Sequence, residues 1–136
     1  MQKEQLERRL TEYMAAIRSM ETDRWVGEFA ENATVEDPVG TPEVRGHEQL
    51  RTFFDGVRKR LRLLDVAPEF VVVSGSEAAV RWSATSFTHN DLTAKFPGIS
   101  AFKFREDGKI LQLRAYWDAK DVARQFAAAQ AQTQKG

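Results

Sequence analysis

Residues 79–89 read AVRWSATSFTH, and their pattern is the strongest indication of the fold class. Side chains of different character alternate along this stretch with a period of two, which is typical of a β-strand with two unlike faces. Turn-forming residues stand on both sides, SGSE at 74–77 and ND at 90–91. The stretch therefore predicts one long strand of an antiparallel sheet, with a tight turn at each end.

The same alternation continues on both sides of this strand. We expect a strand at Phe70–Val73 before it and strands at about Thr93–Arg105 and Ile110–Trp117 after it. EDGK at 106–109 is a strong hairpin signal between the last two strands. Pro97-Gly98 should bulge or interrupt the middle one, because proline cannot donate to a strand ladder. The second half of the chain thus predicts a four-stranded antiparallel meander.

The first half of the chain has helical periodicity instead. It predicts a long first helix whose apolar stripe includes Tyr13, a short second helix with Thr22 as N-cap, and a third helix after Gly46. The second helix should carry Trp25, Val26, Phe29 and Ala30, and residues 33–37 should form a short strand that Pro38 ends. Helices followed by strands predict an α+β fold, a curved antiparallel sheet with three helices packed on its concave face.

The length of 136 residues fits one domain, which we place at residues 1–120. Residues 121–136 form a tail rich in Ala and Gln, for which a helix and disorder are both open. The first nine residues have no apolar signal core, and no stretch approaches the roughly 20 apolar residues of a membrane span. A cytoplasmic location without membrane contact is the resulting expectation.

Composition argues against several classes of function. Lys plus Arg and Asp plus Glu number 20 each, so overall charge does not favour nucleic acid, and the basic stretch RKRLR at 58–62 is interpreted as a solvated helix end. There is no cysteine, and His47 and His89 are far apart, so we expect no metal. His47 should be exposed in the first turn of a helix. No phosphate-binding or dinucleotide glycine motif is present, so we expect no cofactor.

Four side chains with polar atoms stand at places that the pattern turns inward, namely Tyr13, Asp37, Ser100 and Trp117. A carboxylate among aromatic rings costs free energy unless it is paired or used. From the residues alone, Asp37 either caps the turn that Pro38 begins or works as a chemical group, and the cap is the commoner role of Asp before Pro.

Several blocks of the sequence resemble the bacterial ketosteroid isomerases, within the NTF2-like and SnoaL-like superfamily. They are ATVEDPVG at 33–40, RGHEQLRTFF at 45–54, FREDGKI at 104–110 and AYW at 115–117. The resemblance spans about residues 6–120 and implies a cone-shaped α+β fold, a homodimer and no cofactor. It also implies that Asp37 is a general base and Tyr13 an oxyanion donor.

The chain departs from the pattern of that family at three positions. Ser100 stands where the family carries a second aspartate, and Phe29 and Phe54 stand where it often has tyrosines that support the oxyanion donor. Tyr13 should therefore lack that hydrogen-bond network. Ser100 is expected to serve as a weaker second donor, which implies a slower isomerase.

The implied function is an isomerase that moves a proton α to a ketone, of the Δ5 to Δ4 3-ketosteroid type, on a small hydrophobic steroid-like substrate. The expected pocket walls are Trp117, Phe54, Phe87, Phe102 and Val39. One alternative is a non-catalytic binder of a hydrophobic metabolite, and another is a SnoaL-like cyclase or dehydratase. A third is a scaffold domain, which would have a filled core without a pocket.

Overall fold

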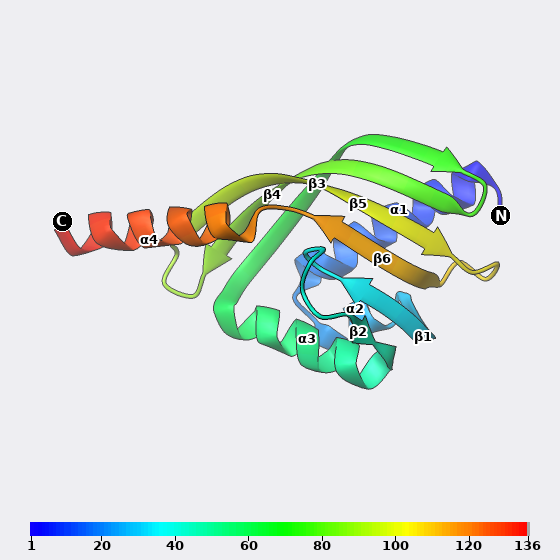
Figure 1. Cartoon of the computed structure of the whole chain (residues 1–136), viewed down its shortest axis with the longest axis horizontal. Coiled ribbons are helices and arrows are strands. Elements are labelled where there is room, and N and C mark those ends of the chain that lie inside the picture. Colours follow the sequence, from blue (N-terminus) through cyan, green and yellow to red (C-terminus); the bar gives the residue numbers. More distant parts are fainter. Residues whose placement is uncertain (136) are drawn as a thin grey trace.

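The computed structural model describes residues 1–135, in which one curved sheet is covered by helices (Figure 1). The elements follow one another as α1 Lys3–Ser19, α2 Thr22–Val26, β1 Phe29–Glu36, β2 Val44–Arg45, α3 Gly46–Arg60, β3 Leu61–Ser74, β4 Glu77–Thr88, β5 Thr93–Phe104, β6 Ile110–Tyr116 and α4 Ala119–Lys135. The α+β class and the meander β3 to β6 are confirmed.

The sheet contains more than the meander. Its strand order is β2-β1-β6-β5-β4-β3, and β1 runs parallel to β6 while the other neighbours are antiparallel. The expectation of a wholly antiparallel sheet is therefore wrong at this one pair. Strand β1 thus lies beside the last strand of the meander, and β2 forms the outer edge beyond it.

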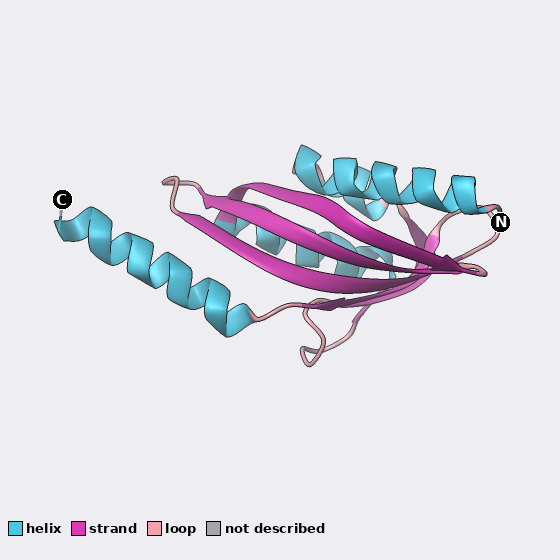
Figure 2. Cartoon of the chain, turned by 90° about the horizontal axis from the view of Figure 1, so that it is seen from above, coloured by secondary structure: helices cyan, strands magenta, loops and turns pink. Residues whose placement is uncertain are grey.

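The helices and the inner face of the sheet enclose the core. Helix α1 lies along β3 and α3 along β1, and Figure 2 shows α1 on one face of the sheet and α4 running out beyond the body. Val80, Trp82 and Ala84 of β4 are buried, whereas Arg81 and Ser83 between them are exposed. The even-numbered side chains of β4 thus face the helices. No helix within residues 1–135 has the length and hydropathy that crossing a membrane requires.

Helix α2 is shorter than its apolar residues suggest. Phe29 and Ala30 begin β1 instead of extending the helix, and Phe29 pairs with Ile110 of β6. Glu21, not Thr22, is the N-cap. The Thr22 hydroxyl instead donates to Asp55 of α3 at 2.5 Å. Because this bond joins two helices, Thr22 holds α2 against α3 and does not cap its own helix.

Strand β5 is not interrupted at Pro97-Gly98, contrary to expectation. It pairs with β4 without a register shift from Thr93 to Lys103, and Pro97 lies opposite Ser83. The partner on its other side, β6, pairs only from Ile99 onward. Residues 93–98 therefore have a free edge, where a proline is tolerated because no ladder bond is needed on that side.

Gly98 is required by the ring of Trp82, and this gives a first prediction. A Cβ atom at position 98 would lie 2.2 Å from Cζ2 of Trp82. Gly98→Ala should therefore destabilise the protein by about 1–3 kcal/mol, the usual cost of overpacking, as measured by urea unfolding. Gly56→Ala is the control, because nothing lies within 4 Å of its added Cβ and alanine favours a helix. Equal stabilities of the two variants would contradict this role.

Candidate active site

A cavity of about 990 Å³ opens between the concave face of the sheet, the helices α1 to α3 and the first turns of α4. This volume is at the upper end of the usual range for small-molecule sites, roughly 300–1,000 Å³. Most of its wall is apolar, with contributions from Met14, Ile17, Phe53, Val57, Leu64, Val66, Ala84, Leu113 and Ala115. A cavity of this size excludes the filled core that a pure scaffold domain would have.

Asp37 follows directly after β1, and its carboxylate lies in the wall of the cavity. The indole N–H of Trp117 donates to its Oδ1 at 2.5 Å. Burial raises the pKa of Asp37 to about 6, while the bond from Trp117 acts in the opposite direction. A carboxylate with a pKa near 6 is mostly ionised at pH 7 and still basic enough to take a proton, which suits a general base.

The turn after Asp37 is closed without its side chain. The N–H of Val39 donates to the carbonyl of Ala115 at 2.8 Å, and the N–H of Thr41 donates to the carbonyl of Pro38 at 3.2 Å. Within residues 1–135, the hydrogen bond to the Asp37 carboxylate comes from Trp117. The interpretation of Asp37 as a turn cap is therefore wrong.

Tyr13 reaches the cavity from the buried stripe of α1 and is only 4% exposed. Burial raises the pKa of its hydroxyl far above the ordinary value, and the charge of Asp37 acts in the same direction. Tyr13 therefore keeps its proton at neutral pH. The edges of Phe29 and Phe102 pack against its ring, with centroids 5.9 Å and 5.2 Å away.

Trp25 supplies a partner for Tyr13 that the sequence analysis missed. Its indole N–H donates to the Tyr13 hydroxyl at 3.4 Å, and its ring stacks on Phe54 at 4.9 Å. Phe29 and Phe54 carry no hydroxyl group, so the family's tyrosine network is missing as expected, and Trp25 supplies one long hydrogen bond in its place. A signal for this bond is present in the sequence, since a buried tryptophan needs an acceptor for its N–H.

Ser100 is buried in β5 and lines the cavity together with Trp82. The Trp82 indole N–H donates to its Oγ at 2.9 Å. An indole nitrogen can only donate, so Ser100 must be the acceptor in this bond and its own proton points elsewhere. Ser100 is therefore available as a donor to a ligand. Trp82, which holds it in this role, was also missed as a site residue.

Two of the five expected wall residues lie in the cavity wall, namely Trp117 and Phe54. The other three do not. Phe87 is an odd-numbered residue of β4 and faces outward, where the Arg62 guanidinium lies over its ring. Phe102 faces inward but is buried against Tyr13, and Val39 sits in the loop after β1. Phe96 takes the expected place instead, 5.2 Å from Trp117 and 5.9 Å from Trp82.

Both histidines form hydrogen bonds with backbone carbonyl groups. His47 is half-buried, contrary to expectation, because its Nε2 is bonded to the carbonyl of Phe29 at 2.8 Å. His89 is exposed, and its Nε2 is bonded to the carbonyl of Arg58 at 2.7 Å. Within residues 1–135, no three His, Asp or Glu side chains gather in a way that could hold a metal ion.

Helix α4 forms one wall of the cavity. The sequence left both a helix and disorder open for this part of the chain. The residues that line the cavity recur at helical spacing, namely Ala119, Val122, Ala123 and Phe126. Gln125 fixes this helix to the free edge of β5. Its amide oxygen accepts from the N–H of Lys95 at 2.9 Å, and its amide nitrogen donates to the carbonyl of Lys95 at 2.7 Å.

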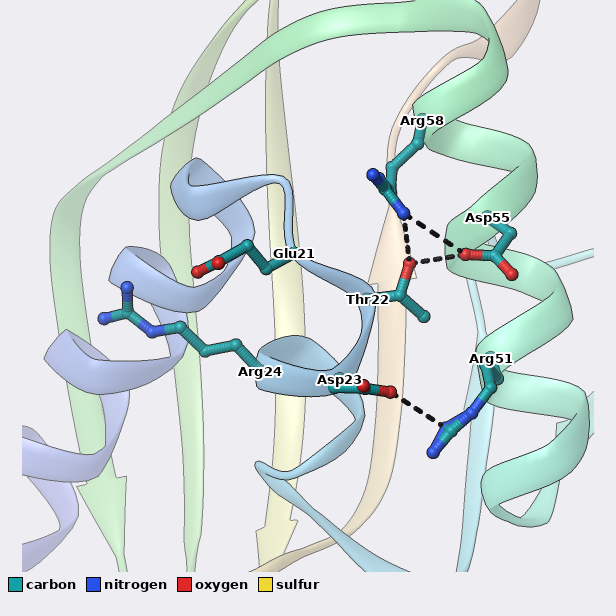
Figure 3. A pocket seen from close by; sticks show the side chains of 7 residues that line it. All are labelled: Glu21, Thr22, Asp23, Arg24, Arg51, Asp55 and Arg58. Carbon is teal, nitrogen blue, oxygen red and sulfur yellow. Dashed lines mark hydrogen bonds and ion pairs between the residues drawn. The ribbon is translucent and has the colours of Figure 1, made fainter.

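A second pocket of about 460 Å³ lies between α2 and α3, and its wall is charged (Figure 3). Arg51 pairs with Asp23 at 3.4 Å, and Arg58 pairs with Asp55 at 3.7 Å. Exposed pairs of this kind contribute roughly 0–1 kcal/mol each. Because these charges are already matched, we interpret the pocket as a network that joins the two helices.

The comparisons with known proteins agree with this fold. Residues 10–113 match the SnoaL-like domain family, which is most of the chain, so the protein belongs to that family, within the NTF2-like superfamily. Among solved structures, it is similar to the epoxide hydrolase/cyclase-like enzyme SalBIII, which is described as having a role in pyran ring formation in the polyether salinomycin. The two are 28% identical, with a TM-score of 0.77 over 89% of this chain and 97% of that chain.

Proposed function

We propose that the protein is an isomerase that moves a proton next to the ketone of a hydrophobic steroid-like substrate. Asp37 is the general base, and Tyr13 and Ser100 donate hydrogen bonds to the oxygen. The observation that carries this proposal is one carboxylate of raised pKa in an apolar cavity whose wall also contains the buried hydroxyl groups of Tyr13 and Ser100. The resemblance of the block around Asp37 to the ketosteroid isomerases points to the same reaction.

The proposed reaction needs only one base. Asp37 takes the proton from the carbon between the carbonyl and the C=C bond, and the electron pair of that C–H bond moves into a dienolate. Negative charge develops on the oxygen, where Tyr13 and Ser100 donate. Asp37 then returns the proton to the far carbon of the former C=C bond, which leaves a conjugated enone. Within residues 1–135, Asp37 is the only carboxylate in the cavity wall, which supports a mechanism with one base.

The pH dependence of turnover gives a test of this base. The active form of Asp37 is the ionised one, and its pKa is about 6. We expect kcat/KM for androst-5-ene-3,17-dione, followed by enone absorbance, to be level above pH 7 and to fall tenfold per pH unit well below 6. A profile that stays level down to pH 4, or no turnover at any pH, would contradict the assignment. Tight binding without turnover would indicate a binding protein instead.

A cyclase is the second candidate, and the similarity to SalBIII favours it. In this reaction Asp37 would take the proton of a substrate hydroxyl, and the oxygen would attack the β-carbon of an enone in the same molecule. The proton would return to the α-carbon, and Tyr13 and Ser100 would again stabilise the enolate oxygen. Ring closure of a hydroxy-enone without isomerisation of a steroid would favour this candidate.

We also propose that the protein forms a homodimer through the outer face of the sheet. Phe70, Ile99 and Tyr116 are 58%, 50% and 45% exposed and lie in one row across the strands, with Arg81 between the first two. Exposed apolar patches of this kind mark interaction sites. Sedimentation equilibrium at micromolar concentration tests the proposal, and a monomer there would refute it.

A further inference from the structure

The structure divides the basic stretch at the end of α3 into two kinds of residue. Arg58 pairs with Asp55 at 3.7 Å, and Arg62 pairs with Asp91 at 2.7 Å. Lys59 and Arg60, which lie between them, make no ion pair within residues 1–135, and both line the large cavity. Cations suit the carboxyl end of a helix, but that preference does not explain why these two line the cavity.

These two cations mark one end of the cavity. Leu61, the next residue, pairs with Thr88 at the end of β4, and His89 is bonded to the carbonyl of Arg58. Figure 1 shows the end of α3 beside the turn between β4 and β5. Thr88, His89 and Asn90 also line the cavity, so this end of its wall is polar as well as positively charged.

Asp37 and Ser100 lie in the part of the cavity that is far from Lys59 and Arg60. Ser100 pairs with Val80 of β4, and Thr88 lies eight residues further along the same strand. At a rise of about 3.3 Å per residue, the two levels are roughly 26 Å apart along the strand. A ligand that uses both ends must therefore be elongated, with an apolar body between two polar ends.

We propose that the cavity takes an elongated hydrophobic ketone that carries a carboxylate at the end remote from the reacting oxygen, and that Lys59 and Arg60 bind this carboxylate. The proposal rests on the proposed function for the ketone end, and it adds the charge and length of the substrate. Arginine can bind a carboxylate with two parallel hydrogen bonds, and lysine adds a second positive charge. Asp37, the one carboxylate that residues 1–135 contribute to the wall, belongs to the other end, so it does not compete for these cations.

A matched pair of probes tests the carboxylate directly. The first is 3-oxochol-4-en-24-oic acid and the second is its methyl ester, which has the same body without the charge. Both are already conjugated enones, so binding is measured without turnover, by quenching of the fluorescence of Trp25, Trp82 and Trp117, which all line the cavity. We expect the acid to bind at least about tenfold more tightly than the ester in low salt, and the difference to shrink as salt is added.

Two variants locate the effect. Lys59→Gln with Arg60→Gln should bring the affinity for the acid down to that for the ester. Lys103→Gln is the matched control, because Lys103 is an exposed lysine of β5 that is not in the cavity wall, and it should change neither affinity. Equal affinities of acid and ester in the natural protein would overturn the inference, and so would a double variant that still prefers the acid. Turnover of the uncharged androst-5-ene-3,17-dione by the natural protein judges the proposed isomerase separately.

Discussion

Asp37→Asn is expected to lower kcat/KM for the isomerisation by about 10²–10⁴-fold, the range that general-base catalysis contributes. Asparagine has nearly the shape of aspartate, and its amide oxygen can still accept the bond from Trp117. The loss would therefore report the missing base and not a changed cavity. Enone absorbance measures it at pH 7 and above, where the natural carboxylate is ionised.

The same substitution should make the protein more stable at pH 7. The pKa of Asp37 is about 6 in the folded protein against an ordinary value of 3.8, so the folded state holds a proton that the unfolded state has released. Stability therefore falls as pH rises from 3.8 to 6 and stays lower above that window. Asparagine does not ionise, so Asp37→Asn should gain up to about 3 kcal/mol at pH 7 and little at pH 3.5. Urea unfolding at both pH values measures the gain.

Glu36→Gln is the control for both effects. Glu36 is the neighbouring carboxylate, half-buried and paired with Arg114 at 3.6 Å, and it is not in the cavity wall. Its replacement should leave turnover unchanged and should not stabilise the protein. If Asp37→Asn kept its activity, Asp37 would not be the base. If the variant lost stability at pH 7, the ionised Asp37 carboxylate would not destabilise the folded protein.

Tyr13→Phe is expected to lower kcat by about 10²–10³-fold, the usual cost of removing one oxyanion donor. The phenylalanine ring keeps the contacts with Phe29 and Phe102. Since the lost bond strengthens as charge develops on the oxygen, KM should change much less than kcat. Steady-state kinetics on the same steroid separate the two parameters.

Two further variants compare the contribution of Tyr13 with those of Ser100 and Trp25. Ser100→Ala should cost less than Tyr13→Phe, because a serine hydroxyl is less acidic than a phenol. Trp25→Phe should cost least, because it removes only a long bond of 3.4 Å to Tyr13 and keeps an aromatic ring in the cavity wall. A loss that appears in KM alone after Tyr13→Phe would show that the hydroxyl binds the ground state and does not stabilise the transition state.

Local patterns predicted those parts of the fold that depend on neighbours in the sequence. The alternation around Trp82 predicted β4, and the turns at 74–77 and 106–109 predicted the hairpins. The parallel pairing of β1 with β6 depends on contacts between residues about 80 positions apart, such as Val35 with Leu113. No periodicity carries that information. The expected interruption at Pro97 is wrong for the same reason, because a strand tolerates proline where the neighbouring strand, here β6, no longer pairs with it.

The candidate site was predictable to a similar extent. The resemblance led to Asp37, Tyr13 and Ser100, and the structure places all three in one cavity wall. It did not lead to Trp25 and Trp82, because a tryptophan in an apolar stripe is read as core although its N–H must find an acceptor. Phe87 was misplaced because a shift of one residue reverses the face of a strand, and the sequence alone did not settle that register.

The paired bonds between Gln125 and the backbone of Lys95 have a consequence for the solubility of the protein. A primary amide that accepts from a backbone N–H and donates to the carbonyl of the same residue occupies both groups that a neighbouring strand would use. Residues 93–98 would otherwise present open pairing groups to any extended chain, and such edges promote aggregation. Helix α4 thus lines the cavity and, with a single side chain, occupies the pairing groups of Lys95 in this stretch of β5.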